Sequence, residues 1–498
     1  MTKRAAIILL ICLVYIALRF WNLTASCLWF DEIFSIHAAE HAWRDLFRFV
    51  AQDLIHPPLF YVLLKIWIFI GGESLFWLRF FPVFFSMAAL IPFLFLCRQL
   101  KLSFPAIAVA FAFFAANGSL IKYAQEVRMY SLLLCAGLFS LWLFVRFVNT
   151  GKGFPALLIV NVLLVYTHYF GWLVVASEIF AALVLARHRR KPILLMLAVT
   201  FASFTPWIYA IWQASKINSN VGQNIGWMSK PNLLSVFQFV FDLFEPIYYE
   251  QSNTDSPAIV LITLPILAVG ILAYGFYFAA WKTESDAEKR NFQMLLIFFF
   301  TPLALAFAAS WLSPYSIWGT RHLIIVFAPL TILTAIAFSK INFSQLKFAA
   351  LGVIFLLFGA AFVLQATRKQ PQYVWCAWEN LANSLDAKQG AKIYVFEDLV
   401  AYHFWFASRN SDGKIQIVKI NDLEGLTEDK AYFLPRGFDE VQTANVFEGE
   451  RFFVAFRAKT FDEFAPPLQN LKAQNYQIGA PQIYQAQGLK AFLVEVRK

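Results

Sequence analysis

Charged residues are scarce in this chain: Asp, Glu, Lys and Arg together account for 14% of its 498 residues. Hydrophobic residues make up 60% of it and aromatic residues 18%, including 56 phenylalanines. A soluble globular domain does not need that much apolar surface, so the composition predicts a polytopic membrane protein. The net charge of +10 does not indicate nucleic-acid binding, because the basic residues cluster between hydrophobic runs, as they do in cytoplasmic loops.

Cysteine is also scarce, with five residues in the chain. That number is too small for a disulfide framework that would hold a secreted fold together. Cys12, Cys97 and Cys135 lie within apolar runs. Cys27 and Cys376 are therefore the pair that can meet outside the membrane. The chain has no internal repeat and no low-complexity segment.

Long apolar runs extend to residue 365, and about eleven of them can cross a bilayer. The first follows Lys3-Arg4 and is typical of a retained signal-anchor. The candidate spans cover residues 5–22, 77–97, 104–120, 129–147, 155–168, 171–186, 192–212, 257–280, 291–311, 322–339 and 345–365.

One further apolar run, at 59–70, decides the topology. It follows Pro57-Pro58, a favourable helix start, and ends at Gly71-Gly72. A helix of this length covers about 18 Å, short of the ~30 Å hydrocarbon core. We therefore predict a juxtamembrane or re-entrant helix that does not cross.

The positions of the basic residues support this topology. With 59–70 not crossing, the short loops rich in Lys and Arg all fall on one side, as the positive-inside rule requires. These loops are residues 3–4, 98–101, 146–152, 187–191, 282–290 and 340–347. The N-terminus is then cytoplasmic, and the first outer loop (about 23–76) and the C-terminal tail lie on the other side.

The tail, residues 366–498, has the composition of an ordinary soluble domain. Runs at 392–396, 414–420 and 451–456 are typical of strands, and helical patterns lie between them. We predict a soluble α/β domain after a transmembrane domain of residues 1–365.

Asp31 and Glu32 form an adjacent acidic pair just after the first span. Two ionised carboxylates beside a bilayer are costly unless they are solvated, paired or used in chemistry. One interpretation makes them reactive groups. The other makes them caps of the helix that follows, since carboxylates are favourable at helix N-termini.

Four more segments bring polar residues to the same predicted face. Each has a structural interpretation, as a turn or an interfacial anchor, and a functional one, as a donor to phosphate or sugar. Together they supply arginines and histidines suited to a phosphate leaving group, near a carboxylate suited to deprotonation. The residues are His56, Glu126, Arg128, Tyr130, His168, Tyr169, Arg321 and His322.

The order of these motifs resembles a family of bacterial membrane glycosyltransferases. The motifs are Asp-Glu in the first outer loop, His-Pro-Pro-Leu at 56–59, Gln-Glu-x-Arg-Met-Tyr at 125–130, Tyr-x-His-Tyr-Phe-Gly at 166–171 and a late Arg-His at 321–322. These enzymes have the GT-C fold and are similar to protein O-mannosyltransferases and the lipid A aminoarabinose transferase. The resemblance covers about residues 1–365.

The resemblance implies a polyprenyl-phosphate sugar as donor and a glycan, lipid or protein hydroxyl as acceptor, on the outer face of the bacterial plasma (inner) membrane. It maps the catalytic base onto Asp31, which would deprotonate the acceptor in an inverting transfer. Arg128 and Arg321 would stabilise the departing phosphate. Glu32, His56 and His168 would contact substrate. Some relatives use a divalent metal; we expect no obligatory one, because the first outer loop lacks Asp-x-Asp.

Three other functions remain open from the residues. A secondary transporter would carry ionisable residues in mid-span and two similar halves. A polymerase or ligase would move whole glycans between lipid carriers. A non-catalytic scaffold would not need Asp31 together with both arginines.

Overall fold

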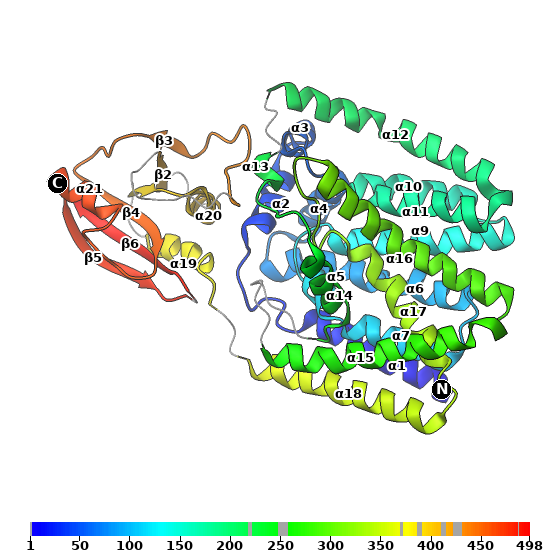
Figure 1. Cartoon of the computed structure of the whole chain (residues 1–498). Helices are drawn as coiled ribbons and strands as arrows, with labels where there is room; N and C mark the ends of the chain where they lie inside the picture. The colour runs from blue at the N-terminus through cyan, green and yellow to red at the C-terminus, as the bar shows by residue number, and fades with distance from the viewer. Residues whose placement is uncertain are drawn as a thin grey trace. The chain divides into compact units, whose positions relative to one another are not determined.

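The structure is a computed structural model that describes residues 2–217, 222–247, 257–368, 372–385, 391–409, 415–421, 431–486 and 488–498. These residues form two compact units that do not follow the chain order. The helical unit contains residues 1–23, 54–217 and 228–368, and the sheet unit contains residues 24–53, 218–227 and 369–498. Each unit is coloured by chain position in Figure 1.

The helical unit is a bundle of apolar helices. Its elements are α1 (Lys3–Phe20), α4 (Leu59–Gly71), α5 (Leu75–Ala88), α6 (Leu90–Gln99), α7 (Phe104–Ala116), α8 (Gly118–Ala124), α9 (Tyr130–Thr150), α10 (Phe154–Thr167), α11 (Gly171–Leu185), η1 (Arg187–Arg189), α12 (Arg190–Ile217), α14 (Leu233–Phe244), α15 (Pro257–Ala280), η2 (Trp281–Thr283), α16 (Asp286–Leu312), η3 (Ile324–Val326), α17 (Phe327–Ser339) and α18 (Ser344–Thr367). Helices lie within every predicted span, and the spans at 77–97 and 104–120 are each divided between two helices.

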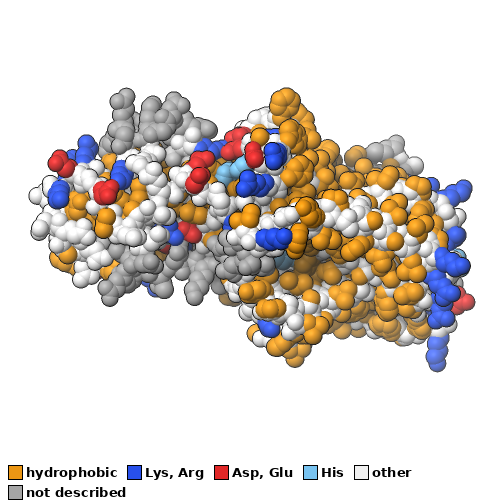
Figure 2. Space-filling model, turned by 90° about the horizontal axis from the view of Figure 1, so that it is seen from above, with side chains coloured by type: hydrophobic (Ala, Val, Ile, Leu, Met, Phe, Trp, Pro, Cys, Tyr) orange, Lys and Arg blue, Asp and Glu red, His pale blue; other side chains and the backbone are white. Residues whose placement is uncertain are grey.

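Six helical stretches of the described chain are long and apolar enough to cross a membrane. They are Leu75–Gln99, Tyr130–Thr150, Arg187–Ile217, Pro257–Thr283, Asp286–Leu312 and Ser344–Thr367. Hydrophobic side chains cover much of the visible side of the bundle, as a bilayer-facing surface requires (Figure 2). The run at 59–70 forms α4, a helix of 13 residues that packs against α5 and α10.

The loops rich in Lys and Arg meet at one end of the bundle, where basic side chains gather in Figure 2. Arg290 donates a hydrogen bond to Oδ1 of Asn149 over 3.2 Å, and Asn291 donates to the Leu100 carbonyl over 3.5 Å. α9 runs from Tyr130 to Thr150, and its 21 residues span about 30 Å. The contact at Asn149 therefore lies near one end of α9, and Tyr130 lies at the other end.

The sheet unit is a six-stranded mixed sheet with helices. Its elements are α2 (Phe30–Glu40), α3 (Trp43–Asp53), α13 (Gly222–Ile225), α19 (Cys376–Leu385), β1 (Ala391–Val395), α20 (Asp398–Ser408), β2 (Ile415–Ile420), β3 (Gln442–Ala444), β4 (Arg451–Ala458), α21 (Leu468–Ala473), β5 (Gln477–Tyr484) and β6 (Lys490–Arg497). The strand order is β3-β2-β1-β4-β6-β5.

The pairing in this sheet changes direction at β4. Strands β3, β2, β1 and β4 are parallel, with Ile393 opposite Phe453, whereas β4, β6 and β5 are antiparallel, with Val454 opposite Val494. Val454 and Val494 are fully buried in the core of the sheet unit. The predicted soluble α/β layer is present, and the three strands predicted from sequence are β1, β2 and β4; Lys414, where the second predicted run began, lies outside the described residues.

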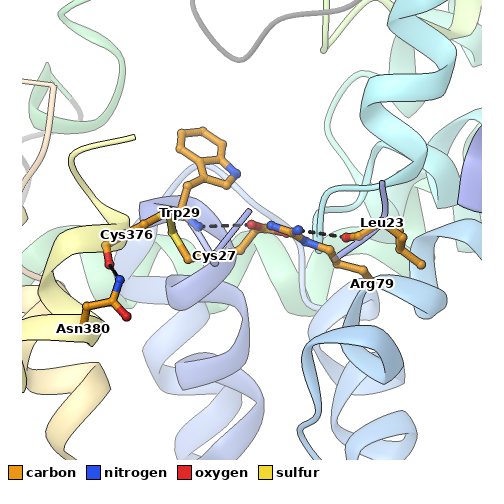
Figure 3. Close-up of a disulfide and its surroundings, with 7 residues drawn as sticks. Leu23, Cys27, Trp29, Arg79, Cys376 and Asn380 are labelled. Atoms are coloured by element: carbon orange, nitrogen blue, oxygen red, sulfur yellow. Dashed lines mark hydrogen bonds between the residues drawn. A yellow bond between two sulfur atoms is a disulfide. The ribbon is translucent and has the colours of Figure 1, made fainter. Parts of the chain in front are cut away.

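The Cys27–Cys376 disulfide lies within the sheet unit. It joins two residues 349 positions apart in sequence (Figure 3), the same pair that sequence analysis left able to meet.

Candidate functional site

Four residues from distant segments form a cluster at one end of the helical unit, which we call the histidine cluster: His56, Arg128, His168 and His322. His56 precedes α4, Arg128 lies between α8 and α9, His168 joins α10 to α11, and His322 precedes η3. Three of these side chains, those of His56, Arg128 and His168, are at most 5% exposed. All four are among the site residues predicted from the sequence.

Short distances link the members of the histidine cluster. Nη2 of Arg128 lies 3.2 Å from Nε2 of His56. Because a guanidinium can only donate, this ring nitrogen of His56 is the acceptor. The ring centroids of His56 and His168 are 5.7 Å apart, and those of His168 and His322 are 5.6 Å apart.

Hydrogen bonding and burial both hold His168 in its neutral form. The backbone N–H of Phe170 donates to Nδ1 of His168 over 3.0 Å, so the ring proton is on Nε2. Burial lowers the pKa of His168 well below its usual range, and the charges of His56, Arg128 and Arg321 lower it further. A neutral imidazole beside arginines offers an N–H donor without adding charge.

His322 is held in a similar environment. Its pKa is lowered well below the usual value, first by burial and then by Arg321 and the other members of the cluster. Nδ1 of His322 is buried and accepts no hydrogen bond within the described part of the chain. Its ring also packs against Phe170 at 5.4 Å and Tyr130 at 6.2 Å, so Tyr130 belongs beside the cluster as well.

A group of charged residues adjoins Arg321: Glu126, which was predicted from the sequence, and Lys122, Asp242 and Glu245, which were not. Burial lowers the pKa of Lys122, and Arg321 lowers it too, while Glu126, Asp242 and Glu245 act in the opposite direction. Oδ2 of Asp242 accepts from the Thr320 hydroxyl over 2.8 Å, next to Arg321. Lys122 lies between the predicted spans at 104–120 and 129–147, and its charge in the same short segment as Glu126 and Arg128 was the available signal.

Gln125, in the same motif as Glu126 and Arg128, fixes the end of α1. Its side-chain amide donates to the carbonyls of Arg19, over 3.0 Å, and Trp21, over 2.7 Å. Nη1 of Arg79 donates to the Leu23 carbonyl over 2.9 Å (Figure 3). Hydrogen bonds therefore hold the backbone of residues 19–23, which precede the segment that carries Asp31.

Tyr169 points to a neighbouring helix. Its hydroxyl accepts from Nε1 of Trp207 in α12 over 3.3 Å, and its ring lies 6.3 Å from that of Phe204. These contacts give Tyr169 a packing role between α11 and α12.

Asp31 and Glu32 lie at the N-terminus of α2, in the sheet unit. Oε2 of Glu32 accepts from the backbone N–H of Trp29 over 3.1 Å, and Glu32 is fully buried. Glu32 therefore makes the capping contact that the structural interpretation of the pair described. Asp31, the second residue of the helix, is partly buried, in a position where the helix dipole favours a carboxylate.

No family model and no curated protein sequence matches the chain. Solved structures do match it. ArnT from Cupriavidus metallidurans bound to undecaprenyl phosphate has a TM-score of 0.61 at 11% identity, covering 98% of this chain and 97% of that one. The same protein in the apo state has a TM-score of 0.57 at 12% identity, covering 99% and 98%.

An oligosaccharyltransferase is also similar. The apo form from Archaeoglobus fulgidus has a TM-score of 0.50 at 12% identity, covering 83% of this chain and 64% of that one. Identities this low concern the fold alone. The chain has the GT-C fold, as the order of its motifs predicted, and the match to ArnT includes the C-terminal domain because it covers nearly the whole of both chains.

Proposed function

We propose that this protein is an inverting glycosyltransferase that moves a sugar from a polyprenyl-phosphate donor to a hydroxyl acceptor. The observation that carries the proposal is the histidine cluster, in which four separate segments bring Arg128 and three histidines together. The fold shared with ArnT, whose structure holds undecaprenyl phosphate, supports the same donor class.

The histidine cluster suits a phosphate leaving group. Arg128 and Arg321 carry permanent positive charge, and a guanidinium can donate two parallel hydrogen bonds to phosphate oxygens. His168, neutral with its proton on Nε2, adds a donor. When the bond between the anomeric carbon and the phosphate oxygen breaks, these groups stabilise the negative charge that develops on the lipid phosphate.

Asp31 is assigned the role of general base. The acceptor hydroxyl loses its proton to this carboxylate as its oxygen attacks the anomeric carbon, and the phosphate leaves from the opposite face. One displacement inverts the configuration at that carbon. The phosphate departs as a stable anion, so the reaction needs no general acid.

No step of this mechanism runs through a metal ion. The first outer loop lacks Asp-x-Asp, so no metal ligand is assigned there. Adding EDTA to the transfer assay tests whether the reaction needs a metal ion.

We propose that the reaction takes place on the outer face of the plasma membrane. Disulfides persist in oxidising compartments, so the Cys27–Cys376 bond supports a periplasmic or extracellular sheet unit. The basic loops gathered at one end of the bundle, a helix length from the histidine cluster, support a cytoplasmic location for that end.

The first experiment compares sugar transfer by the full chain and by Asp31→Asn. Both are offered a panel of polyprenyl-phosphate sugars and a labelled membrane extract as acceptor, with and without EDTA. We expect transfer by the parent, insensitive to EDTA, and a loss of about 100-fold or more in the variant, since general-base catalysis contributes about that much.

Donor binding provides the control in this experiment. Asp31→Asn should bind polyprenyl phosphate as tightly as the parent, because the phosphate site lies in the helical unit. Full activity in Asp31→Asn would show that Asp31 is not the general base. Failure of the parent to bind or turn over any donor would favour the transporter instead.

A further inference from the structure

The segment that carries Asp31 packs as part of the sheet unit. Residues 24–53 connect α1 to α4 along the chain, yet they cluster with residues 369–498 and not with either helix. We call residues 24–53 the carboxylate segment. Anchors along its whole length tie it to the C-terminal domain.

The first anchor is the Cys27–Cys376 disulfide, four residues before Asp31 (Figure 3). Cys376 is the first residue of α19. Two residues further on, the fully buried Trp378 packs against Phe404 of α20, with ring centroids 5.5 Å apart. The start of the carboxylate segment is thus bonded to a helix that is embedded in the domain.

The second set of anchors lies along α2. Nδ1 of His37 is 2.9 Å from the Tyr402 hydroxyl, and its ring centroid is 4.4 Å from that of Trp405. Nε of Arg409 lies 3.1 Å from Oε1 of Glu40. All three partners come from α20 or the residue that follows it.

These contacts leave Asp31 on a different face of α2. Phe30, whose ring lies 5.2 Å from that of Tyr402, shares the docking face with His37 and Glu40. Successive residues of a helix are turned by about 100° around its axis. Viewed down the axis of α2, Phe30, His37 and Glu40 lie within an arc of about 80°, and Asp31 lies about 100° beyond the edge of that arc. The helix can therefore be held by the C-terminal domain while its carboxylate serves another purpose.

The third anchor is at the end of the carboxylate segment. Nη1 of Arg436 donates to the Gln52 carbonyl over 2.6 Å, and Nη2 donates to Oδ1 of Asn224 over 3.0 Å. The amide of Asn224 in turn donates to Oδ1 of Asp53 over 2.7 Å. The last turn of α3 is therefore pinned to residue 436 of the tail.

We propose that the C-terminal domain is the positioning scaffold for Asp31, and that the Cys27–Cys376 disulfide is its redox-sensitive latch. This inference rests on the proposed function. Two electrons and two protons from an external dithiol convert the disulfide into two thiols, while the dithiol becomes a cyclic disulfide. Among the described contacts of α2, the partly exposed Glu40–Arg409 ion pair, the His37–Tyr402 hydrogen bond and the ring contacts then remain, and contacts of these kinds are individually weak.

Reduction should therefore lower turnover without weakening donor binding. A small displacement of a reacting group costs about 10- to 100-fold in rate. We expect kcat to fall by about that factor, and the Kd for polyprenyl phosphate to stay within about twofold, because the histidine cluster belongs to the helical unit.

The experiment uses the full chain, oxidised, reduced with dithiothreitol and reoxidised. Cys27→Ser/Cys376→Ser should show the low kcat at once and respond no further to dithiothreitol. Tyr402→Phe, which removes the hydroxyl beside His37, should lower kcat to a smaller extent. Arg451→Gln is the matched control, because it breaks an ion pair with Glu495 on the sheet, away from the carboxylate segment.

Hydrogen exchange of residues 28–40 gives a readout that does not need activity. We expect faster exchange on reduction, reversed on reoxidation. If mass spectrometry shows that the disulfide is reduced and the exchange rate of residues 28–40 is nevertheless unchanged, the scaffold proposal is wrong. It is also wrong if the oxidised protein transfers sugar and reduction leaves its kcat unchanged. If reduction weakens donor binding as much as it lowers kcat, general unfolding and not the position of Asp31 explains the loss of activity, and the proposal is wrong. An oxidised parent that transfers no sugar but shows the exchange response would reject the enzyme assignment and keep the scaffold.

Discussion

Arg128 is the residue whose replacement tests the candidate phosphate site most directly. Its side chain is 3% exposed, and its Nη2 already donates to His56. Arg128→Lys keeps the positive charge but loses the planar guanidinium, whose several N–H groups can bind the His56 ring and a phosphate at the same time. We expect the Kd for a short-chain polyprenyl phosphate in detergent to rise about tenfold, the equivalent of about 1.4 kcal/mol. Arg187→Lys, exposed in η1, is the control and should bind normally. Equal affinity in both variants would refute the phosphate site.

His403 makes the stability of the sheet unit depend on pH. It is 4% exposed on α20, and burial lowers its pKa to about 3. The unfolded chain takes up a proton near pH 6.5, whereas the native state stays neutral down to about pH 3. Stability from this residue is thus constant above pH 6.5 and falls by about 1.4 kcal/mol per pH unit below it.

The measurement is thermal melting of the sheet unit in the full chain between pH 7 and pH 4. His403→Gln cannot take up the proton, so its melting temperature should depend less steeply on pH than that of the parent. The variant starts from a lower stability at pH 7, because its amide is also buried. Identical slopes in the two proteins would show that His403 is not buried in the native state.

The polar residues show what sequence can and cannot predict at this level. The charge of the loops placed His56, Arg128, His168 and His322 on one face before any contact was known. Side-chain direction was not predictable, since it depends on packing between helices distant in sequence. Tyr169, next to His168, turns to Trp207 for that reason, and Glu32 caps α2 beside the proposed base.

The turn between α10 and α11 depends on Gly171. A Cβ at this position would lie 2.6 Å from the Leu164 carbonyl oxygen, so the backbone that carries His168 would have to shift. We expect Gly171→Ala to lower the melting temperature and to weaken donor binding. Gly275→Ala in α15 meets nothing within 4 Å and should be neutral or stabilising, since alanine is favoured over glycine in helices by about 1 kcal/mol. The comparison fails if both variants behave like the parent.

Glu178 in α11 holds three helices together by hydrogen bonds. Its Oε1 accepts from Ser140 of α9 over 2.6 Å, and its Oε2 accepts from Asn161 of α10 over 2.6 Å. Glu178→Ala leaves two buried polar groups without this partner, and such groups cost about 1–3 kcal/mol each. We expect a lower melting temperature of the helical unit. Thr205→Ala, on the exposed face of α12, is the control and should melt like the parent.

Elements were predictable where one face or the whole surface is apolar. The six described helical stretches that are long enough to cross a membrane have continuous apolar runs, and β1 and β4 are short apolar strands, so the sequence predicted an element at each of these places. β5, Gln477–Tyr484, was missed because most of its residues are exposed and Gly479 and Pro481 interrupt it. Its place in the sheet comes from pairing with β6, and no local pattern encodes that pairing.

The units of the whole molecule combine segments that are far apart in the chain. The carboxylate segment lies between two helices of the helical unit in sequence but packs with the tail, because a disulfide, an ion pair and Arg436 connect them. The cysteine pair was predictable from the sequence, whereas the change in composition marks one boundary, at residue 365. Contacts across more than 300 residues depend on the folded structure and leave no periodic signal.

The orientation of the whole chain in the membrane can be tested with a membrane-impermeant maleimide. Lys152→Cys and Lys282→Cys put single exposed thiols in the basic loops, and Lys459→Cys puts one in the turn after β4. In the topology proposed above, the first two lie in the cytoplasm, as the positive-inside rule predicts, and the sheet unit lies in an oxidising compartment, where disulfides persist. In intact cells with a permeable outer membrane, Lys459→Cys should therefore label, whereas the two loop variants should label only after lysis. Labelling of the basic loops in intact cells would contradict the predicted topology, in which the run at 59–70 does not cross the membrane.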